Sequence, residues 1–439
     1  MLKFLLFLYF SIVLNATNFT LVKKDSLDSE PTLLVIGGIH GNEPGGYFAP
    51  AILAQHYDIS RGSLWVVPDL NRKSIQVNSR GLNGDMNRKF ATLKSKDRDA
   101  QTIKEIKELI LNKRVSLVLN LHDGHGFYRK EHKGTIFNPN AWGQTCVIDQ
   151  CSLDKSLRFG NLDEVAKKVS KHLNSTLIKD HHKFSVKNTQ TKFDDEAMQL
   201  SLTYFAVTHN KPAFAIETSK NLSSLSQKVY YQLSAIEAYM DIMGIKYSRD
   251  FVLNEKNIAN LLNDKGSVLI NGNIFLSLND LRKYLKYVPL KRAMNSFEFT
   301  NTLGSVKKIG SSYVIYVGNK RVSTLKPQYF KMKKLDKLVD IEVDSELLSS
   351  PIPSVVVVGN SFNIKAHKSL RVNVIGFSTK KQKNESNIKI TRSQMQENFS
   401  IDVKKSKYRV EFYKGNSFCG MIIIDFKGKA YEKRRFDRE

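Results

Sequence analysis

The sequence predicts an α/β domain followed by two small β-rich domains, and the changing pattern of apolar residues supports each part. Over residues 17–244, short apolar runs alternate with amphipathic helical segments, which is typical of a sheet covered by helices on both faces. Short strands and hairpin turns replace that alternation over residues 247–335. Spaced strands over residues 340–439 predict an Ig-like β-sandwich of roughly 100 residues.

Individual elements of these domains follow from local periodicity. Continuous apolar runs predict four buried strands in the first domain, at residues 33–36, 64–67, 117–119 and 213–216. Apolar residues three and four positions apart predict helices around residues 103–110, 162–173 and 222–240. In the second domain, Asn271-Gly272 lies between two apolar runs and predicts a tight hairpin turn.

The composition excludes several classes of protein. Hydrophobic residues make up 41% of the 439 residues and charged residues 25%, so the chain is neither disordered nor collagen-like. Three cysteines are too few for a scaffold built on disulfides. The 68 Lys and Arg exceed the 42 Asp and Glu and give a formal net charge of +26, which favours an anionic partner such as nucleic acid, acidic lipid or a cell-wall polymer. A solvated basic surface is equally consistent, and no basic run is long enough to indicate a nucleic-acid site.

The N-terminus has the pattern of a secretory signal peptide. Lys3 precedes an unbroken apolar run over residues 4–14, and Ala16 provides a small residue at the cleavage position. The run is too short to span a bilayer, which takes about 20 residues. We expect residues 1–16 to be removed on export to the periplasm, with a buried first strand or helix as the alternative. Export argues against nucleic acid as a partner, and no later segment predicts a transmembrane helix in the mature chain.

Two pairs of reactive residues are close neighbours in the sequence. Cys146 and Cys151 predict a local disulfide in an oxidising compartment, which leaves Cys419 unpaired. A Cys-x4-Cys zinc site is less favoured, because no second pair accompanies it. The pair His181-His182 is expected to lie in a solvated loop.

Two strand ends carry residues that could bind a metal ion. The run at 33–36 leads into a glycine-rich turn that contains His40 and Glu43, and the run at 117–119 leads to His122. Ligands bind at the carboxyl ends of strands in open α/β sheets, and glycines let such a turn bend sharply. Two histidines and a glutamate with an open fourth position are the donors of a catalytic zinc site. Either histidine alone is more simply a hydrogen-bonded core residue, but the three residues together favour a metal.

Hydrolysis at a zinc site also requires a base and a clamp for the substrate. Glu217 follows the buried run at 213–216, where a carboxylate is costly without a function or a partner, so we expect it to be the base. A charge at a helix N-terminus is the alternative interpretation. Arg88 with Asn87 could hold a substrate carboxylate through forked hydrogen bonds, and Arg80 could polarise the scissile carbonyl. In isolation, both arginines would be ordinary surface charges.

The order of these motifs resembles the M14-like zinc carboxypeptidase superfamily, which includes carboxypeptidase A. The matching pieces are His40-x-x-Glu43, the stretch from Gly84 to Arg88, and the strand-end His122 and Glu217, over roughly the first half of the chain. The resemblance implies an α/β fold with a mixed sheet flanked by helices. It also implies one zinc ion per chain, with His40, Glu43 and His122 as its ligands.

The same resemblance implies roles for the other site residues. Glu217 is expected to be the general base, and Asn87 and Arg88 to bind the terminal carboxylate of the substrate. Arg80 is expected to polarise the scissile carbonyl. Its spacing from Arg88 is closer to that of the aspartoacylase-like branch than to that of the digestive enzymes.

Together with the signal peptide and the two β-rich domains, the chain looks like the periplasmic peptidoglycan DL-carboxypeptidases that set cell shape in helical bacteria. Those enzymes trim the uncrosslinked tripeptide stem L-Ala-γ-D-Glu-meso-diaminopimelate to a dipeptide. Stem peptides are then the expected partner, and proteins of a cell-shape complex are further candidates. Part of that group has glutamine at the first zinc position, whereas His40 here favours zinc. Trp142 and Thr203 are expected to line the substrate pocket, although an ordinary loop aromatic and a strand threonine are at least as consistent.

Two alternative functions remain open from the sequence. One is another zinc hydrolase of this superfamily, such as an LD-carboxypeptidase, an amidase of different stem preference or an aspartoacylase-like deacylase. The other is a wall-binding scaffold without catalysis, against which the presence of ligands, base and clamp together argues.

Overall fold

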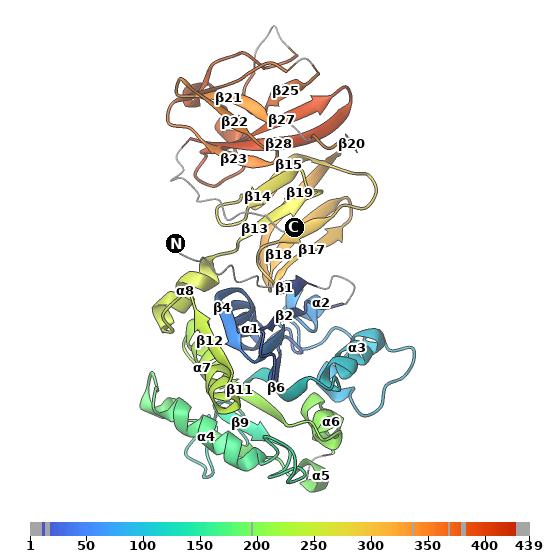
Figure 1. The fold of residues 1–439 in the computed structure, drawn as a ribbon, viewed down its shortest axis with the longest axis vertical. Coiled ribbons are helices and arrows are strands. Elements are labelled where there is room, and N and C mark those ends of the chain that lie inside the picture. The colour runs from blue at the N-terminus through green and yellow to red at the C-terminus, as the bar shows by residue number, and fades with distance from the viewer. Residues whose placement is uncertain are drawn as a thin grey trace, which may run out of the picture. The chain divides into compact units, whose positions relative to one another are not determined.

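The computed structural model in Figure 1 describes the chain in two compact units, Met1–Asp264 and Lys265–Glu439. The first unit is an α/β unit with a mixed sheet and helices, and the second is rich in strands, so the predicted fold class is confirmed. The structure describes residues 11–13, 18–194, 196–335, 338–367, 369–378 and 383–426.

The predicted signal peptide at residues 1–16 lies outside the described residues, apart from the short strand β1 (Ser11–Val13). Among the residues that the structure describes, no helix is both long enough and apolar enough to cross a membrane.

An eight-stranded mixed sheet forms the centre of the first unit, in the order β1-β2-β5-β3-β6-β11-β9-β10. Four central strands run parallel to one another, namely β5 (Ser63–Val67), β3 (Thr32–Ile36), β6 (Val115–Gly124) and β11 (Ala213–Ser219). They contain the four apolar runs of the sequence, because both faces of each strand are covered. The outer strands are β2 (Val22–Asp25), β9 (Thr145–Ile148) and β10 (Ser185–Asn188).

Helices cover both faces of this sheet (Figure 1). On one side, α7 (Leu225–Met243) packs against both α1 (Pro44–His56) and α4 (Leu162–Asn174). On the other side lie α3 (Ala100–Ile110) and α6 (Leu202–Thr208). Short helices occupy the connections: α2 (Arg72–Gln76), the 3-10 turn η1 (Met86–Arg88), α5 (Thr191–Asp194), the 3-10 turn η3 (Met198–Leu200) and α8 (Glu255–Asn263).

Local capping explains where α7 begins and ends. The Ser224 side chain accepts a hydrogen bond from the backbone of Gln227, and Gly244 ends the helix with a φ of 78°, which a glycine adopts without strain. The predicted segment 222–240 therefore shifts toward the C-terminus, because Leu222 lies in the connection before this cap.

The second unit begins with the predicted hairpin. The strands β13 (Ser267–Ile270) and β14 (Ile274–Ser277) pair across Asn271 and Gly272, whose φ values of 53° and 71° suit a tight turn. The strand β16 (Phe297–Phe299) extends this sheet. A neighbouring four-stranded sheet consists of β15 (Tyr284–Leu290), β19 (Lys320–Tyr329), β18 (Ser312–Val317) and β17 (Gly304–Ile309).

Two further sheets enclose one hydrophobic core in the last part of the chain. One contains β20 (Lys331–Met332), β28 (Ser417–Asp425), β27 (Lys407–Lys414), β25 (Arg371–Val374) and β23 (Ser354–Val357). The other contains β22 (Glu346–Ser350), β21 (Val339–Val343), β24 (Ser361–Ile364) and β26 (Ile390–Thr391).

Of two predictions from neighbouring residues, the first is wrong and the second holds for only one of its residues. Cys146 is buried inside β9 whereas Cys151 is exposed after the strand, and both are free thiols, so the predicted disulfide is not formed. His181 is exposed, as predicted, but His182 is not solvated. The His182 side chain is 2% exposed, stacks on Phe127 with ring centroids 5.9 Å apart, and places its Nδ1 2.9 Å from the hydroxyl of Tyr231.

Candidate metal and substrate site

The glycine-rich turn after β3 and the end of β6 bring the predicted metal ligands together. The turn is tight, because a Cβ on Gly37 would lie 2.1 Å from the carbonyl oxygen of Gly46. His40 and Glu43 leave this turn just before α1, and His122 lies on the adjacent strand β6. One potential ligand atom from each of these three buried residues lies within 4.8 Å of the others.

The three side chains fit a metal ion. Nδ1 of His40 and Nδ1 of His122 lie 3.1 Å and 2.9 Å from the same oxygen, Oε2 of Glu43. His40 Nδ1 is buried and makes no hydrogen bond to the described residues, so its lone pair is available to a ligand. Two imidazole nitrogens and a carboxylate oxygen converging on one point are the donor set of a catalytic zinc site.

Asp85 orients His40 from behind. Its Oδ1 lies 2.7 Å from Nε2 of His40, the ring nitrogen opposite the proposed ligand atom, and its Oδ2 accepts a hydrogen bond from Nε of Arg80 at 2.9 Å. Such carboxylate partners fix the orientation of metal-binding histidines. Burial would raise the pKa of Asp85, but the His40 and Arg80 contacts outweigh it and lower that pKa. The Gly84–Arg88 stretch contains this aspartate, but nothing in the local sequence pattern distinguishes it from a surface charge.

Glu43 carries the charge at the centre of this group. Burial opposes its ionisation, yet the close contacts with His122 and His40 hold the pKa of its carboxyl well below the usual range. Its second oxygen, Oε1, accepts from Nη1 of Arg80 at 3.2 Å and from Nζ of Lys220 at 3.4 Å. Glu43 is therefore ionised, with one oxygen toward the histidines and the other toward two cations.

Glu217 lies beside this group rather than in it. The strand register pairs it with His122 across β11 and β6. Burial first, then the negative charges of Glu43 and Asp123, raise the pKa of its carboxyl well above the usual range. Gly124 makes room for it, because a Cβ there would lie 2.8 Å from Oε2 of Glu217. A carboxyl that holds a proton more tightly than usual is suited to general acid–base chemistry.

Arg88 and Asn87 lie in η1 at the opposite side of the pocket. Arg88 is half-buried, donates from Nη1 to the Asn87 carbonyl at 3.0 Å, and approaches Sδ of Met198 through Nη2 at 3.6 Å. Asn87 Oδ1 accepts from the backbone of Leu202 at 3.0 Å, which ties η1 to the start of α6. Thr203 follows on that helix.

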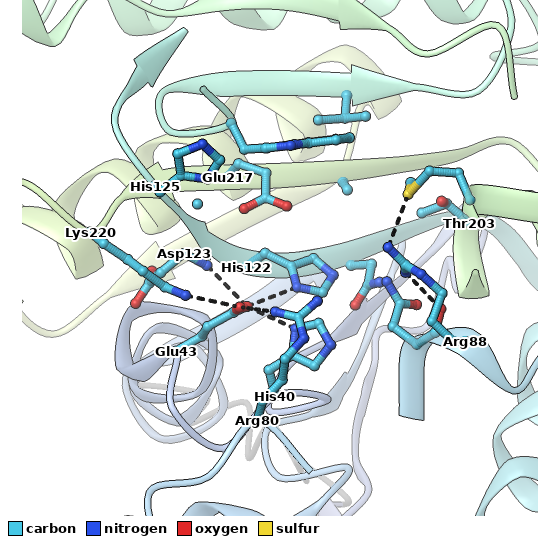
Figure 2. A pocket seen from close by; sticks show the side chains of 17 residues that line it. His40, Glu43, Arg80, Arg88, His122, Asp123, His125, Thr203, Glu217 and Lys220 are labelled. Atoms are coloured by element: carbon cyan, nitrogen blue, oxygen red, sulfur yellow. Dashed lines mark hydrogen bonds and ion pairs between the residues drawn. The ribbon is translucent and has the colours of Figure 1, made fainter. Parts of the chain in front are cut away.

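All nine predicted site residues line one pocket of about 250 Å³, whose lining side chains are drawn in Figure 2. They are His40, Glu43, Arg80, Asn87, Arg88, His122, Trp142, Thr203 and Glu217. Four further polar residues that line the pocket were not predicted, namely Asn120, Asp123, His125 and Lys220. Asn120 and Asp123 flank His122 on β6, and Lys220 follows Glu217 by three residues, so proximity to the recognised motifs could have indicated them.

The fold and the pocket together define a hydrolase of the metallo-carboxypeptidase class. The chain belongs to the family described as the catalytic part of the carboxypeptidase controlling helical cell shape, peptidase M99, which matches residues 2–263. Residues 332–427 match a second family, the C-terminal domain of metallo-carboxypeptidase. The resemblance inferred from the sequence is thereby confirmed, and the chain is an enzyme of this class.

Solved structures of one protein resemble nearly the whole chain. Apo cell shape determinant protein Csd4 from Helicobacter pylori is 36% identical with a TM-score of 0.88, and its tripeptide-bound form is 37% identical with a TM-score of 0.87; each comparison covers 93% of this chain and 100% of that one. The mDAP-bound form of Helicobacter pylori Csd4, described as a D,L-carboxypeptidase, is 37% identical over 92% of this chain and 100% of its own, with a TM-score of 0.88. No curated protein sequence matches the chain at a significant level.

Proposed function

We propose that this protein is a zinc D,L-carboxypeptidase that removes meso-diaminopimelate from uncrosslinked peptidoglycan tripeptide stems and leaves a dipeptide. The observation that carries the proposal is the gathering of a histidine–glutamate–histidine group, a buried carboxyl and an arginine in one pocket. Similarity over nine-tenths of the chain to a D,L-carboxypeptidase with bound mDAP supports the choice of substrate.

His40, Glu43 and His122 would hold the zinc ion, with Asp85 fixing the ring of His40. A zinc ion held there would supply Lewis-acid chemistry, which would polarise the scissile carbonyl and make a water molecule a better nucleophile. Nitrogen and carboxylate donors favour zinc over hard cations such as magnesium, which prefer oxygen ligands.

Arg88 would anchor the free carboxylate of the residue to be released. Its guanidinium is already held against the Asn87 carbonyl, so little side-chain entropy is lost when it binds an anion. Because Asn87 Oδ1 is engaged by Leu202, only the amide nitrogen of Asn87 is available to the same carboxylate. Trp142 and Thr203 would form the walls beside it.

Glu217 would move the proton. In its ionised form it accepts a proton from the attacking water, and it then donates that proton to the leaving amine. Burial, and then the nearby carboxylates of Glu43 and Asp123, raise the pKa of its carboxyl, which favours the transfer from water. Arg80, held by Glu43 and Asp85, would stabilise the charge that develops on the scissile carbonyl oxygen.

The proposed setting is the periplasm, reached by export with removal of residues 1–16. Stem peptides carry several carboxylates, and the excess of basic residues in the chain favours their approach. Proteins of a cell-shape complex are proposed as further partners. Nucleic acid is not, because export would separate the protein from it.

A digest of purified muropeptides by the zinc-loaded protein, read by mass spectrometry, tests this function. We expect tripeptide stems to become dipeptides, and the Glu217→Ala variant to retain zinc and fold but to lose turnover, since Glu217 is not a ligand. Cleavage of other stems instead of tripeptides would favour another zinc hydrolase of the superfamily. Bound zinc without any cleavage would refute the peptidoglycan substrate, and full activity of Glu217→Ala would refute its role as base.

A further inference from the structure

The floor of the pocket continues beyond the metal ligands as a second row of side chains. The strand registers pair Ala215 of β11 with Asn120 of β6 on one side and with Val147 of β9 on the other. This row lies two residues before His122 and Glu217 on their strands, so it shares their face of the sheet at a distance of about 6.6 Å. All three residues of the row line the pocket.

Asn120 is the polar member of this row, and its amide has no partner. The residue is 1% exposed, and neither Oδ1 nor Nδ2 makes a hydrogen bond to the described residues. The neighbouring side chains in the row, Ala215 and Val147, are apolar and cannot supply one. Buried amides are nearly always paired, because an unmet donor or acceptor is costly. The missing partner of Asn120 must therefore come from what occupies the pocket.

The row lies on the side of the pocket where the released residue would bind. The helix α6, which carries Thr203, packs over β6 and β11. Figure 2 shows Arg88 and Thr203 together on one side of the metal ligands and Lys220 on the other. With the terminal carboxylate at Arg88, as in the proposed function, the side chain of the released residue extends along the floor toward Asn120.

We propose that Asn120 determines specificity by hydrogen-bonding the terminal group of the released residue's side chain, and that it selects a side chain that ends in an amino-carboxylate group. Its amide offers both donors and an acceptor, which match a carboxylate and an ammonium at once. It carries no charge itself, so it complements a group whose own charges cancel. The second amino-carboxylate centre of meso-diaminopimelate is such a group. The inference rests on the proposed function and adds the residue that distinguishes this substrate from others.

Energetics favour strong discrimination at such a position. A pocket that hydrogen-bonds a polar group rejects an analogue without that group, because the buried amide then stays unpaired. We expect a preference of about 10- to 100-fold for a third residue of meso-diaminopimelate over L-norleucine, whose side chain ends in a methyl group.

The test compares L-Ala-γ-D-Glu tripeptides that end in meso-diaminopimelate or L-norleucine, with the zinc-loaded wild type, Asn120→Leu and a matched control, Asn140→Leu. Asn140 is exposed and outside the pocket lining. We expect Asn120→Leu to lose at least about tenfold of the preference in kcat/KM, with unchanged zinc content, whereas Asn140→Leu keeps it. Equilibrium binding of free meso-diaminopimelate and free L-norleucine to the same proteins supplies a readout that is independent of turnover.

The outcomes separate this inference from the proposed function. A wild type that handles both tripeptides equally, or an Asn120→Leu variant that slows both by the same factor, overturns the role of Asn120 while leaving the carboxypeptidase function in place. If neither tripeptide is cut, the proposed function fails, and the binding comparison still decides whether Asn120 selects the amino-carboxylate end.

Discussion

The two units of the chain bury ionisable side chains for different purposes. In the first unit, Glu43, His122 and Glu217 are held at the surface of a pocket, where a ligand can complete their interactions. In the second, Arg409 and Glu411 lie 3.3 Å apart with 5% and 3% exposure and are closed off by protein. Buried charge therefore indicates a functional site only where it faces open space.

The closed pair in the second unit connects two of its sheets. Arg409 on β27 donates from Nη1 to the carbonyl of Tyr287 at 3.0 Å and from Nη2 to that of Lys286 at 3.3 Å, both on β15. Tyr413 donates its hydroxyl to Glu411 at 2.6 Å. Burial raises the pKa of Glu411, with Arg409 and Tyr413 opposing the shift. This pair holds β27 and β15 in a fixed relation.

The two units also differ in net charge. Residues 265–439 carry 34 Lys and Arg against 15 Asp and Glu, a formal +19, whereas residues 1–264 carry 34 against 27, a formal +7. Most of the basic excess of the chain therefore belongs to the unit without the metal-binding group. The larger number of carboxylates in the first unit includes those that line its pocket.

The largest predicted effect is loss of the metal. Chelation, or the His122→Ala variant, should lower kcat/KM at least about 1,000-fold, because the metal supplies several kcal/mol of transition-state stabilisation. Metal content and turnover measured together test this, and hydrogen exchange in β27 should stay unchanged. The control is His132→Ala, an exposed loop histidine. Substantial activity without metal would contradict the assignment of the first unit as a metal-dependent enzyme.

The next effect tests the closed pair. Glu411→Ala leaves the buried guanidinium of Arg409 without its carboxylate, which should cost about 3–5 kcal/mol of stability in the second unit. Hydrogen exchange in β27 reports this locally, while kcat/KM should hold within about twofold. Glu346→Ala, at an exposed position of β22, serves as the matched control and should change neither quantity. Unaltered exchange in Glu411→Ala would show that the pair does not stabilise the unit.

The Arg88→Ala variant separates substrate binding from metal chemistry within the first unit. It should raise KM sharply for substrates with a free terminal carboxylate, since losing a charged, partly buried contact costs on the order of 2–5 kcal/mol. Steady-state kinetics on a substrate amidated at that carboxylate provide the control. The role of Arg88 as a clamp is wrong if wild type and variant differ as much on the amidated substrate as on the substrate with a free carboxylate.

The smallest effect concerns His182, a buried imidazole of the first unit outside the pocket lining. Burial, with the nearby charges of His181 and Lys179, lowers the pKa of His182 to about 4. Between about pH 6.5 and 4 the unfolded chain therefore takes up a proton that the folded chain refuses, so stability falls as the pH falls, by on the order of 1–3 kcal/mol. Urea unfolding of wild type and His182→Gln at pH 7 and pH 5 measures this pH-dependent contribution of His182 to the free energy of unfolding. The two proteins should converge at the lower pH, and a constant difference would contradict the assignment.

The sequence was informative where the signal is local. Apolar runs ending in His40, Glu43, His122 and Glu217 placed these residues at strand ends, because a buried strand reads as continuous apolar residues and its end as a change in composition. The sequence provided no indication that Asp85 contacts His40, because the two residues are 45 positions apart in the chain. Nothing in the local pattern distinguishes that aspartate from a surface charge.

What the sequence alone determined is the order of elements, the family and the residues that end each central strand, since these depend on short-range patterns of polarity. Only the tertiary structure decided which polar atoms find partners. It buried His182, kept Cys146 and Cys151 apart, and left the amide of Asn120 unpaired on the pocket floor. The physical reason is that burial and pairing are set collectively, by segments that are distant along the chain and meet only in the folded protein.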